Sequence, residues 1–312
     1  MPILSLHHVT ATVDEAQADL DFCIGGLGLR LVKKTVNFDN HHVYHFYYGD
    51  EVGTPGTIWT TFPYAGRGLA AGTKGAGQVT TTSFSVPTGS LSFWRTRLAR
   101  QGIPATDVEP RFGEPAIAFS DPSGLAFELI ANGSDERRPW TGGGADADFA
   151  IRGLHSVTCL VHDPGKTIEL MTDLLGFSVV DRVNGRIRLS LQDGGPGRIV
   201  DVAYKEYAPE ASNGLGTVHH VALAIDSEEE QLTLREDLIR RGARVTEVRD
   251  RCYFKSIYFR EPGGVLVEVA TMRPGFTADE EPSRLGSSLK LPPWEEANRA
   301  EIEGALAPVT TR

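Results

Sequence analysis

The sequence predicts an α+β protein built from four copies of one βαβββ unit. Three observations support this prediction. Four segments of the chain open with a similar strand, each strand is followed by a stretch with helical spacing, and each helix gives way to short β-rich runs separated by turn residues. Recurrence of this order along 312 residues indicates a repeated supersecondary unit.

The predicted opening strands share runs of apolar, β-branched and small polar residues. They are Leu6–Val13, Val79–Val86, Leu154–Val161 and Val218–Ile225. Each predicted helix follows its strand closely, over Ala16–Leu27, Ser90–Gln101, Gly165–Leu175 and Glu229–Arg241. A glycine, which readily adopts the left-handed conformation that closes a helix, stands just past each one, at Gly28, Gly102, Gly176 and Gly242.

Turn residues mark the remaining strands and the segment boundaries. The closing strands of the second and fourth units, Gly124–Ile130 and Gly264–Ala270, each follow a turn that contains Pro and Gly. We therefore expect modules at residues 1–64, 78–132, 151–208 and 214–272, with a polar, Gly-rich linker at 133–150. Residues 273–312 form a tail outside the repeats, with a short helix from Pro292 to about Leu306 that could cover a cavity.

The composition disfavours several classes of protein. The 31 Lys and Arg are outnumbered by 41 Asp and Glu, and the formal net charge of −10 argues against nucleic acid as a partner. No apolar run approaches the roughly 18 residues that span a bilayer, and the first residues lack the order of a signal peptide. With three dispersed cysteines in no metal-binding spacing, we expect a cytoplasmic protein with free thiols and no membrane partner. Association into homo-oligomers is left open.

Five short motifs carry a family resemblance that covers nearly the whole chain. They are Leu6-His7-His8-Val9-Thr10, Gly53-Thr54-Pro55-Gly56-Thr57, Gly216-Thr217-Val218-His219-His220-Val221-Ala222, Val267-Glu268-Val269-Ala270 and Leu291-Pro292-Pro293-Trp294. With these motifs the chain resembles the vicinal oxygen chelate superfamily and, within it, the dioxygenases that cleave the rings of hydroquinones and chlorohydroquinones. The resemblance implies two incomplete β-barrels, each made of two βαβββ modules, with modules one and four paired around a metal ion.

Strand alternation identifies the side chains that would form this site. His8 and His220 lie on the mixed faces of the first and fourth opening strands, and Glu268 lies on the mixed face of the last closing strand. The opposite faces of these strands are largely β-branched and suit packing under helices. The three side chains are therefore predicted to face a cavity.

The repeat restricts which units can hold the metal. The equivalent positions of the four opening strands are His8, Thr81, Ser156 and His220, and closing carboxylates occur in the second and fourth units as Glu128 and Glu268. Pairing units one and four gathers His8, His220 and Glu268, whereas the other two units gather Thr81, Glu128 and Ser156, which is no metal site. Pairing units one and two would gather only His8 and Glu128. The sequence therefore favours one functional and one degenerate barrel.

Two imidazoles and one carboxylate are the facial triad typical of non-haem Fe(II) oxygenases. These ligands leave adjacent positions open, so that substrate and dioxygen can bind side by side. We therefore expect Fe(II) as the cofactor, although Mn(II) would fit the same ligands.

The resemblance also implies a set of residues around the substrate, namely His7, Thr10, His219, Arg251 and Tyr258. Ring cleavage needs a base, a donor that stabilises developing peroxide charge, and an acid that helps to break the O–O bond. His219 and Tyr258 can exchange protons and Arg251 is a fixed positive donor, so these three are the predicted catalytic residues. His7 and Thr10 are predicted to bind substrate. Alternation turns His7 and His219 away from the ligand face unless twist or a β-bulge turns them inward.

The other histidines are weaker candidates. His41, His42 and His45 lie where a turn runs into an aromatic strand, and such strands more often belong to the core than to a pocket. His155 and His162 are interpreted as structural.

Together with these residues, the resemblance implies an Fe(II)-dependent extradiol-type dioxygenase that inserts O2 next to the hydroxylated carbon of a hydroquinone, so that the partners are a small aromatic diphenol and O2. Three alternatives remain. A catechol could be the substrate, or the fold could serve as a non-catalytic binding protein. A glyoxalase-like isomerase or lyase normally needs a fourth protein ligand, and the closing run Thr57–Phe62 offers no carboxylate.

Overall fold

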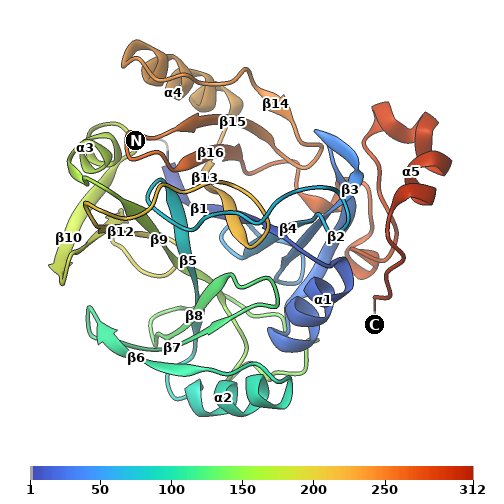
Figure 1. The fold of residues 1–312 in the computed structure, drawn as a ribbon, viewed down its shortest axis with the longest axis horizontal. Coiled ribbons are helices and arrows are strands. Elements are labelled where there is room, and N and C mark those ends of the chain that lie inside the picture. The colour runs from blue at the N-terminus through green and yellow to red at the C-terminus, as the bar shows by residue number, and fades with distance from the viewer. Residues whose placement is uncertain (1–2, 312) are drawn as a thin grey trace.

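Two curled eight-stranded sheets form the molecule, and their helices lie on the outside (Figure 1). The computed structural model describes residues 3–311. Residues 1–2 of the first predicted segment and residue 312 of the last lie outside the described residues. The α+β class and the two incomplete barrels predicted from the sequence are confirmed.

The first sheet combines the first and fourth repeats. Its strands in spatial order are β14 (Arg249–Asp250), β15 (Lys255–Arg260), β16 (Leu266–Thr271), β13 (Thr217–Ile225), β1 (Ile3–Val13), β4 (Ile58–Pro63), β3 (Asn40–Gly49) and β2 (Arg30–Asn37). The two opening strands, β1 and β13, pair antiparallel at the centre, and each pairs in parallel with the closing strand of its own repeat. The predicted pairing of units one and four is therefore correct.

The second sheet repeats this arrangement with the middle two units. Its order is β10 (Phe177–Val183), β11 (Arg186–Leu191), β12 (Ile199–Tyr204), β9 (Gly153–Val161), β5 (Gln78–Val86), β8 (Ala126–Ala131), β7 (Glu114–Ser120) and β6 (Thr106–Arg111). Again the opening strands, β5 and β9, pair antiparallel at the centre. The two sheets share one apolar core, in which Trp59 of β4 packs against Phe127 of β8 with ring centroids 4.9 Å apart.

Each helix follows the opening strand of its repeat, as predicted. The helices are α1 (Ala16–Leu20), α2 (Leu91–Arg100), α3 (Gly165–Asp173) and α4 (Glu228–Arg240). The first is shorter than predicted, because the chain widens into a π-helical turn, η1 (Asp21–Gly26), that contains a Gly pair unfavourable to a regular α-helix. At the start of α4, Ser227 accepts a hydrogen bond from the Glu230 backbone N–H and caps the helix. Within residues 3–311 no helix is both long and apolar enough to cross a bilayer.

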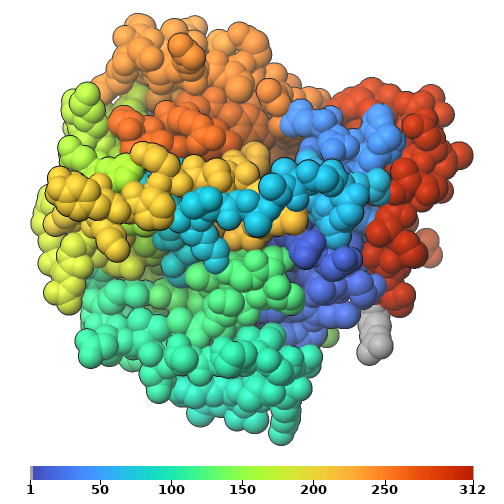
Figure 2. All heavy atoms as spheres, in the orientation of Figure 1, coloured from blue at the N-terminus to red at the C-terminus, as the bar shows by residue number. Residues whose placement is uncertain are grey.

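The tail packs on the outer strands of the first sheet. It contains η2 (Phe276–Ala278), η3 (Pro282–Arg284), η4 (Pro293–Asn298) and α5 (Arg299–Ala305), the last two of which span the predicted helix. Leu291, Ile302 and Leu306 form a small apolar cluster with Val36 of β2. Figure 2 shows the red tail lying against the blue residues of β2 and β3. The tail thus covers the edge of this sheet.

A buried ion network fills the second barrel. The sequence indicated closing carboxylates in the second and fourth units. The structure adds a third one, Asp201 of β12 in the third unit. Asp201 stands opposite Thr158, just as Glu268 stands opposite Ala222, so the two carboxylates hold equivalent positions. Arg188 donates from Nε and Nη2 to the two oxygens of Asp201, at 2.8 and 3.0 Å, and also contacts Glu114. Arg111 pairs with Glu128 through one guanidinium nitrogen. Guanidinium groups therefore neutralise the carboxylates inside the second barrel.

We expect replacement of Arg188 by Met to lower the free energy of unfolding by about 3 kcal/mol, because it leaves buried carboxylates without their main counter-charge. Urea unfolding followed by circular dichroism would measure this. The exposed Arg182→Met, on neighbouring β10, is the matched control and should change the unfolding free energy little. The double variant Arg188→Met with Asp201→Asn should recover part of the loss. Equal stability of Arg188→Met and wild type would contradict the view that the network supports the barrel.

Candidate metal centre

Three buried side chains meet at the centre of the first barrel. Nε2 of His220 lies 2.8 Å from Oε2 of Glu268, Nε2 of His8 lies 3.4 Å from the same oxygen, and the two Nε2 atoms are 3.3 Å apart. All three residues are at most 5 % exposed. The three predicted ligands are thus brought together, and they form a group of donor atoms that could hold a metal ion.

The strand register produces this convergence. In the antiparallel pair β1 and β13, His8 stands opposite Ala222 and Thr10 opposite His220, so the two imidazoles lie diagonally across the ladder. In the parallel pair β13 and β16, Ala222 stands opposite Glu268. Side chains from three adjacent strands therefore point to one place.

The spacing of the donor atoms fits a metal face. Nitrogen and oxygen ligands lie roughly 2.1 Å from a divalent transition metal, so ligands at right angles are about 3.0 Å apart. The three observed separations, 2.8, 3.3 and 3.4 Å, bracket this value. Three donors at such mutual distances occupy one face of an octahedron and leave the opposite face free.

The same register shows what fills the position of a fourth ligand. In the first repeat Thr60 of β4 stands opposite Thr10, as Glu268 of β16 stands opposite Ala222. Thr60 is therefore the structural counterpart of Glu268, and it donates a hydrogen bond to Thr10 Oγ1 at 2.9 Å. A neutral hydroxyl replaces the carboxylate that a fourth ligand would require.

Two β-bulges place His7 and His219 beside the ligands. The ladder skips His7 between Leu6 and His8, and it skips His219 between the pairs Thr10–His220 and Ala11–Val218. As a result, Nδ1 of His7 lies 2.8 Å from Nδ1 of His8, and Nδ1 of His219 lies 2.8 Å from Nδ1 of His220. Each inner imidazole is thus oriented by its sequence neighbour through the nitrogen that does not face the metal position.

The electrostatics of the centre favour the neutral forms of His7, His219 and His220 and the ionised form of Glu268. Burial, together with the adjacent His8 or His220, lowers the pKa of His7 and of His219 to about 3. Burial would raise the pKa of Glu268, but His8 and His220 outweigh it and hold that pKa well below its usual range. The Ser256 hydroxyl donates to Oε1 of Glu268 and leaves Oε2 facing the histidines. These are the protonation states that metal ligation needs.

Arg251 and Tyr258 lie beside the centre. Nε of Arg251 donates to the Tyr258 hydroxyl at 3.1 Å, and the Tyr258 ring lies 5.7 Å from the His220 ring, edge to face. Burial raises the pKa of Tyr258, with Glu268 adding to the effect, so the phenol stays protonated. Asp39, from the turn between β2 and β3, pairs with Arg251 at 3.2 Å and ties this turn to the fourth repeat.

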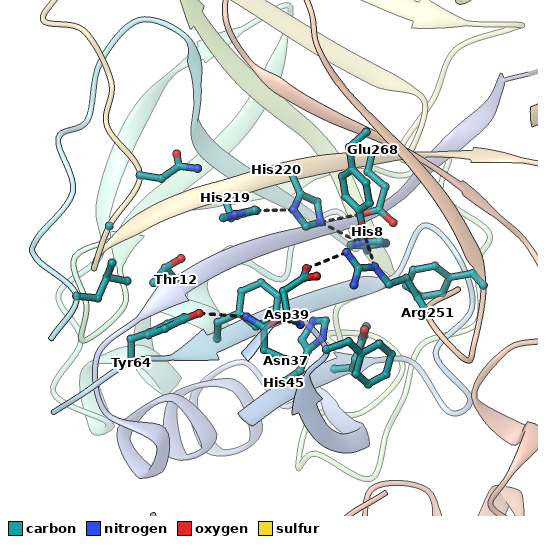
Figure 3. A pocket seen from close by; sticks show the side chains of 18 residues that line it. His8, Thr12, Asn37, Asp39, His45, Tyr64, His219, His220, Arg251 and Glu268 are labelled. Atoms are coloured by element: carbon teal, nitrogen blue, oxygen red, sulfur yellow. Dashed lines mark hydrogen bonds and ion pairs between the residues drawn. The ribbon is translucent and has the colours of Figure 1, made fainter. Parts of the chain in front are cut away.

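The centre opens into a cavity of about 320 Å³ (Figure 3). Six predicted site residues line it, namely His8, His219, His220, Arg251, Tyr258 and Glu268. His7 and Thr10 do not: His7 is buried against Phe254, with ring centroids 4.9 Å apart, and Thr10 is buried and accepts a hydrogen bond from Thr60. Among the described residues, none from the tail lines the cavity. The tail contacts the lining indirectly, because Trp294 packs on the lining residue Phe38.

Sequence reasoning missed part of the lining. Asn37 ends β2, Asp39 lies in the turn that follows, and Tyr64 comes directly after β4. Their approach to the cavity depends on the curl of the sheet, and no sequence signal marks them. His45, one of the weaker candidates from the sequence, does line the cavity, together with Tyr47 of the same strand face.

The remaining histidines lie elsewhere. His41 and His42 contact Glu295 and Glu301 of the tail. His155 bonds to Ser156 and Glu114 inside the second barrel, and His162 contacts Glu210 at the surface. These contacts fit the structural interpretation given to His155 and His162.

Comparison with known proteins adds independent findings. The sequence model of the Glyoxalase/Bleomycin resistance protein/Dioxygenase superfamily matches residues 153–269. The chain is 41% identical over 309 residues to the "Putative ring-cleaving dioxygenase MhqO" of Bacillus subtilis (strain 168), covering 99% of this chain and 97% of that protein. It is 36% identical over 305 residues to the "Chlorohydroquinone/hydroquinone 1,2-dioxygenase" of Sphingobium indicum, covering 95% and 94%. A crystal structure of a "putative dioxygenase" from Bacillus subtilis superposes with a TM-score of 0.95 at 41% identity, covering 100% of this chain and 99% of that one.

Fold and site together define a protein of two βαβββ barrels, the first of which holds a buried centre of two histidines and a carboxylate. The chain belongs to the Glyoxalase/Bleomycin resistance protein/Dioxygenase superfamily, and relatives that match it over almost its whole length are named as dioxygenases.

We expect the wild-type chain to bind one divalent ion, and Glu268→Gln to weaken that binding by at least about 100-fold, because it removes the only charged ligand of the group. Calorimetric titration with Mn(II) under nitrogen would measure both. Glu128→Gln is the matched control, since Glu128 holds the equivalent position in the second barrel and should leave Mn(II) affinity unchanged. Wild-type affinity in Glu268→Gln would show that the ion binds elsewhere.

Proposed function

We propose that this protein is an Fe(II)-dependent dioxygenase that opens the ring of a hydroquinone next to a hydroxylated carbon. The observation that carries the proposal is the convergence of His8, His220 and Glu268 on one wall of a cavity otherwise lined largely by aromatic side chains. This donor set with adjacent open positions is the one that non-haem iron oxygenases use. A bound ferrous ion would supply binding positions for an ionised diphenol and for dioxygen, and the electrons that activate oxygen.

The cavity is suited to one aromatic ring. Its walls include Tyr47, Phe62 and Phe254, and its volume of about 320 Å³ lies at the small end of ligand sites. The relative from Sphingobium indicum, 36% identical over almost the whole chain, is named for hydroquinone and chlorohydroquinone. We therefore assign a monocyclic para-diphenol as the substrate class.

Arg251 would stabilise negative charge beside the metal position. Arg251 stays protonated. Burial lowers its pKa, but Tyr258, Asp39 and Glu268 raise the pKa by more. Its contact with the Tyr258 hydroxyl holds both groups at the wall that carries His220. A charged donor fixed in a largely apolar cavity stabilises developing charge strongly.

His219 would act as a hydrogen-bond donor. If Nε2 of His220 faces the ion, the His220 proton lies on Nδ1 and is donated to Nδ1 of His219. The proton of neutral His219 then lies on Nε2, the nitrogen left free to meet a ligand in the cavity. His219 is therefore assigned the role of a neutral hydrogen-bond donor that stabilises charge on an oxygen during bond cleavage, with Tyr258 as a second donor.

A glyoxalase-type isomerase fits less well, because Thr60 occupies the place of a fourth charged ligand. A catechol would bind through two adjacent oxygens and would need less of the far wall of the cavity than a para-diphenol does.

Protein loaded with Fe(II) under nitrogen should consume one molecule of O2 per hydroquinone and form a ring-opened product, because all the groups required converge in one cavity. An oxygen electrode and absorbance spectroscopy of the product would measure this. Autoxidation of hydroquinone also consumes O2, so the metal-free wild type and Glu268→Gln serve as controls and should show only the background rate. Ring opening of catechol alone would change the assigned substrate, and uptake of neither diphenol above background would refute the proposed function.

A further inference from the structure

His45 is the one histidine of the cavity that the reaction above does not use. It lies on β3, and Figure 3 shows it across the cavity from His220 and Glu268. The residue is 9% exposed. Its ring packs on Tyr47 and Phe62, with centroids 3.9 and 4.3 Å away, so its orientation is fixed by aromatic neighbours on either side along the wall.

A chain of hydrogen bonds fixes which nitrogen of His45 carries the proton. The Thr60 hydroxyl donates its single proton to Thr10 Oγ1 at 2.9 Å, and Nε2 of His45 lies 2.9 Å from Thr60 Oγ1. Because the Thr60 proton is already used, Nε2 must be the donor in this contact. The lone pair of neutral His45 is therefore on Nδ1. Burial, followed by His8 and Arg251, keeps the pKa of His45 well below its usual value, so the ring is neutral.

Nδ1 of His45 is an unused acceptor in the lining of the cavity. No group within residues 3–311 makes a hydrogen bond to it, whereas the oxygen of the neighbouring Asn37 accepts from the Asp39 backbone at 3.0 Å and the Asn37 amide nitrogen donates to the Tyr64 hydroxyl at 3.1 Å. Asp39, the charged group of the turn, is paired with Arg249 and Arg251. A neutral acceptor in an aromatic wall is suited to a hydroxyl proton.

We propose that His45 forms a subsite for the distal hydroxyl of a para-diphenol, whose O–H donates to Nδ1 while the other oxygen lies at the His8, His220 and Glu268 centre. This inference rests on the proposed function for the identity of the ligand. It makes His45 the residue that separates para-diphenols from monophenols. Thr60, the counterpart of Glu268, becomes a positioning residue, because it holds the proton on Nε2.

Binding without oxygen tests the subsite apart from catalysis. Fe(II)-loaded protein would be titrated calorimetrically under nitrogen with hydroquinone and with 4-fluorophenol, which has similar size but no distal O–H. The wild type should bind hydroquinone about 10-fold more tightly, as expected for one hydrogen bond to a buried acceptor. His45→Phe should remove this preference by weakening hydroquinone about 10-fold while leaving 4-fluorophenol within about 2-fold.

Two further variants make the test specific. Thr60→Val, which keeps the side-chain shape, should reduce the preference to about 2- to 3-fold, because His45 can then also place its proton on Nδ1. His162→Phe makes the same chemical change on the surface at Glu210 and should leave both affinities unchanged. Thermal unfolding of each variant confirms that a folded protein is compared.

The outcomes separate the subsite from the reaction. A full preference for hydroquinone in folded His45→Phe would overturn the subsite, even if the wild type cleaves hydroquinone. A preference that is lost in His45→Phe, in a wild type that consumes no O2 above background, would support the subsite and refute the proposed function. Equal affinity of the wild type for both ligands would also overturn the subsite.

Discussion

The antiparallel pairing of β1 with β13 is the contact on which the site depends. It joins residues more than 200 positions apart in the chain, and its register brings His8 within 3.3 Å of His220. The two bulges in the same ladder turn His7 and His219 toward the ligands. If one strand slipped by one residue, each of its side chains that faces the cavity would face the core instead, and each core side chain would face the cavity. The apolar faces that pack under the helices prevent such a slip and therefore also hold the ligands on the cavity side.

The two barrels show how one architecture supports two outcomes. Positions equivalent to His8, His220 and Glu268 recur in the second barrel as Thr81, Ser156 and Glu128, and Asp201 adds a second carboxylate there. Arg111, Arg186 and Arg188 neutralise those carboxylates internally. In the first barrel burial lowers the pKa of His220, and Arg251 is held at the edge by Asp39 and Tyr258. The charge of Glu268 therefore remains available for a cation in one barrel, whereas arginine satisfies the carboxylates in the other.

Much of this arrangement could be predicted from the sequence, because it follows from periodicity and repetition. Alternation along the strands placed His8 and Glu268 on one face, and the repeat-equivalent His220 identified the pairing of the first and last units. From the sequence, a bulge at His7 and at His219 could be stated only as a condition for these side chains to point toward the ligands. Whether a strand bulges depends on the strand with which it pairs. Asp201 was missed although a signal was present, since the turn Gly194-Gly195-Pro196-Gly197 precedes its strand much as Pro262-Gly263-Gly264 precedes the strand of Glu268. Asn37 and Asp39 reach the cavity through a turn that the tail supports, and such long-range contacts leave no local pattern.

The tail and the turn between β2 and β3 connect the outer surface to the cavity. Trp294 packs on Phe38, with ring centroids 5.7 Å apart, and Phe38 is flanked by Asn37 and Asp39, which line the far wall. On the other side of the turn, Asp39 reaches Arg251 of the fourth repeat. The wall opposite the metal position is therefore held by contacts from both ends of the chain, while the metal position is held by the central strands. This separation lets substitutions in the turn or the tail alter which ring fits without disturbing the three ligands.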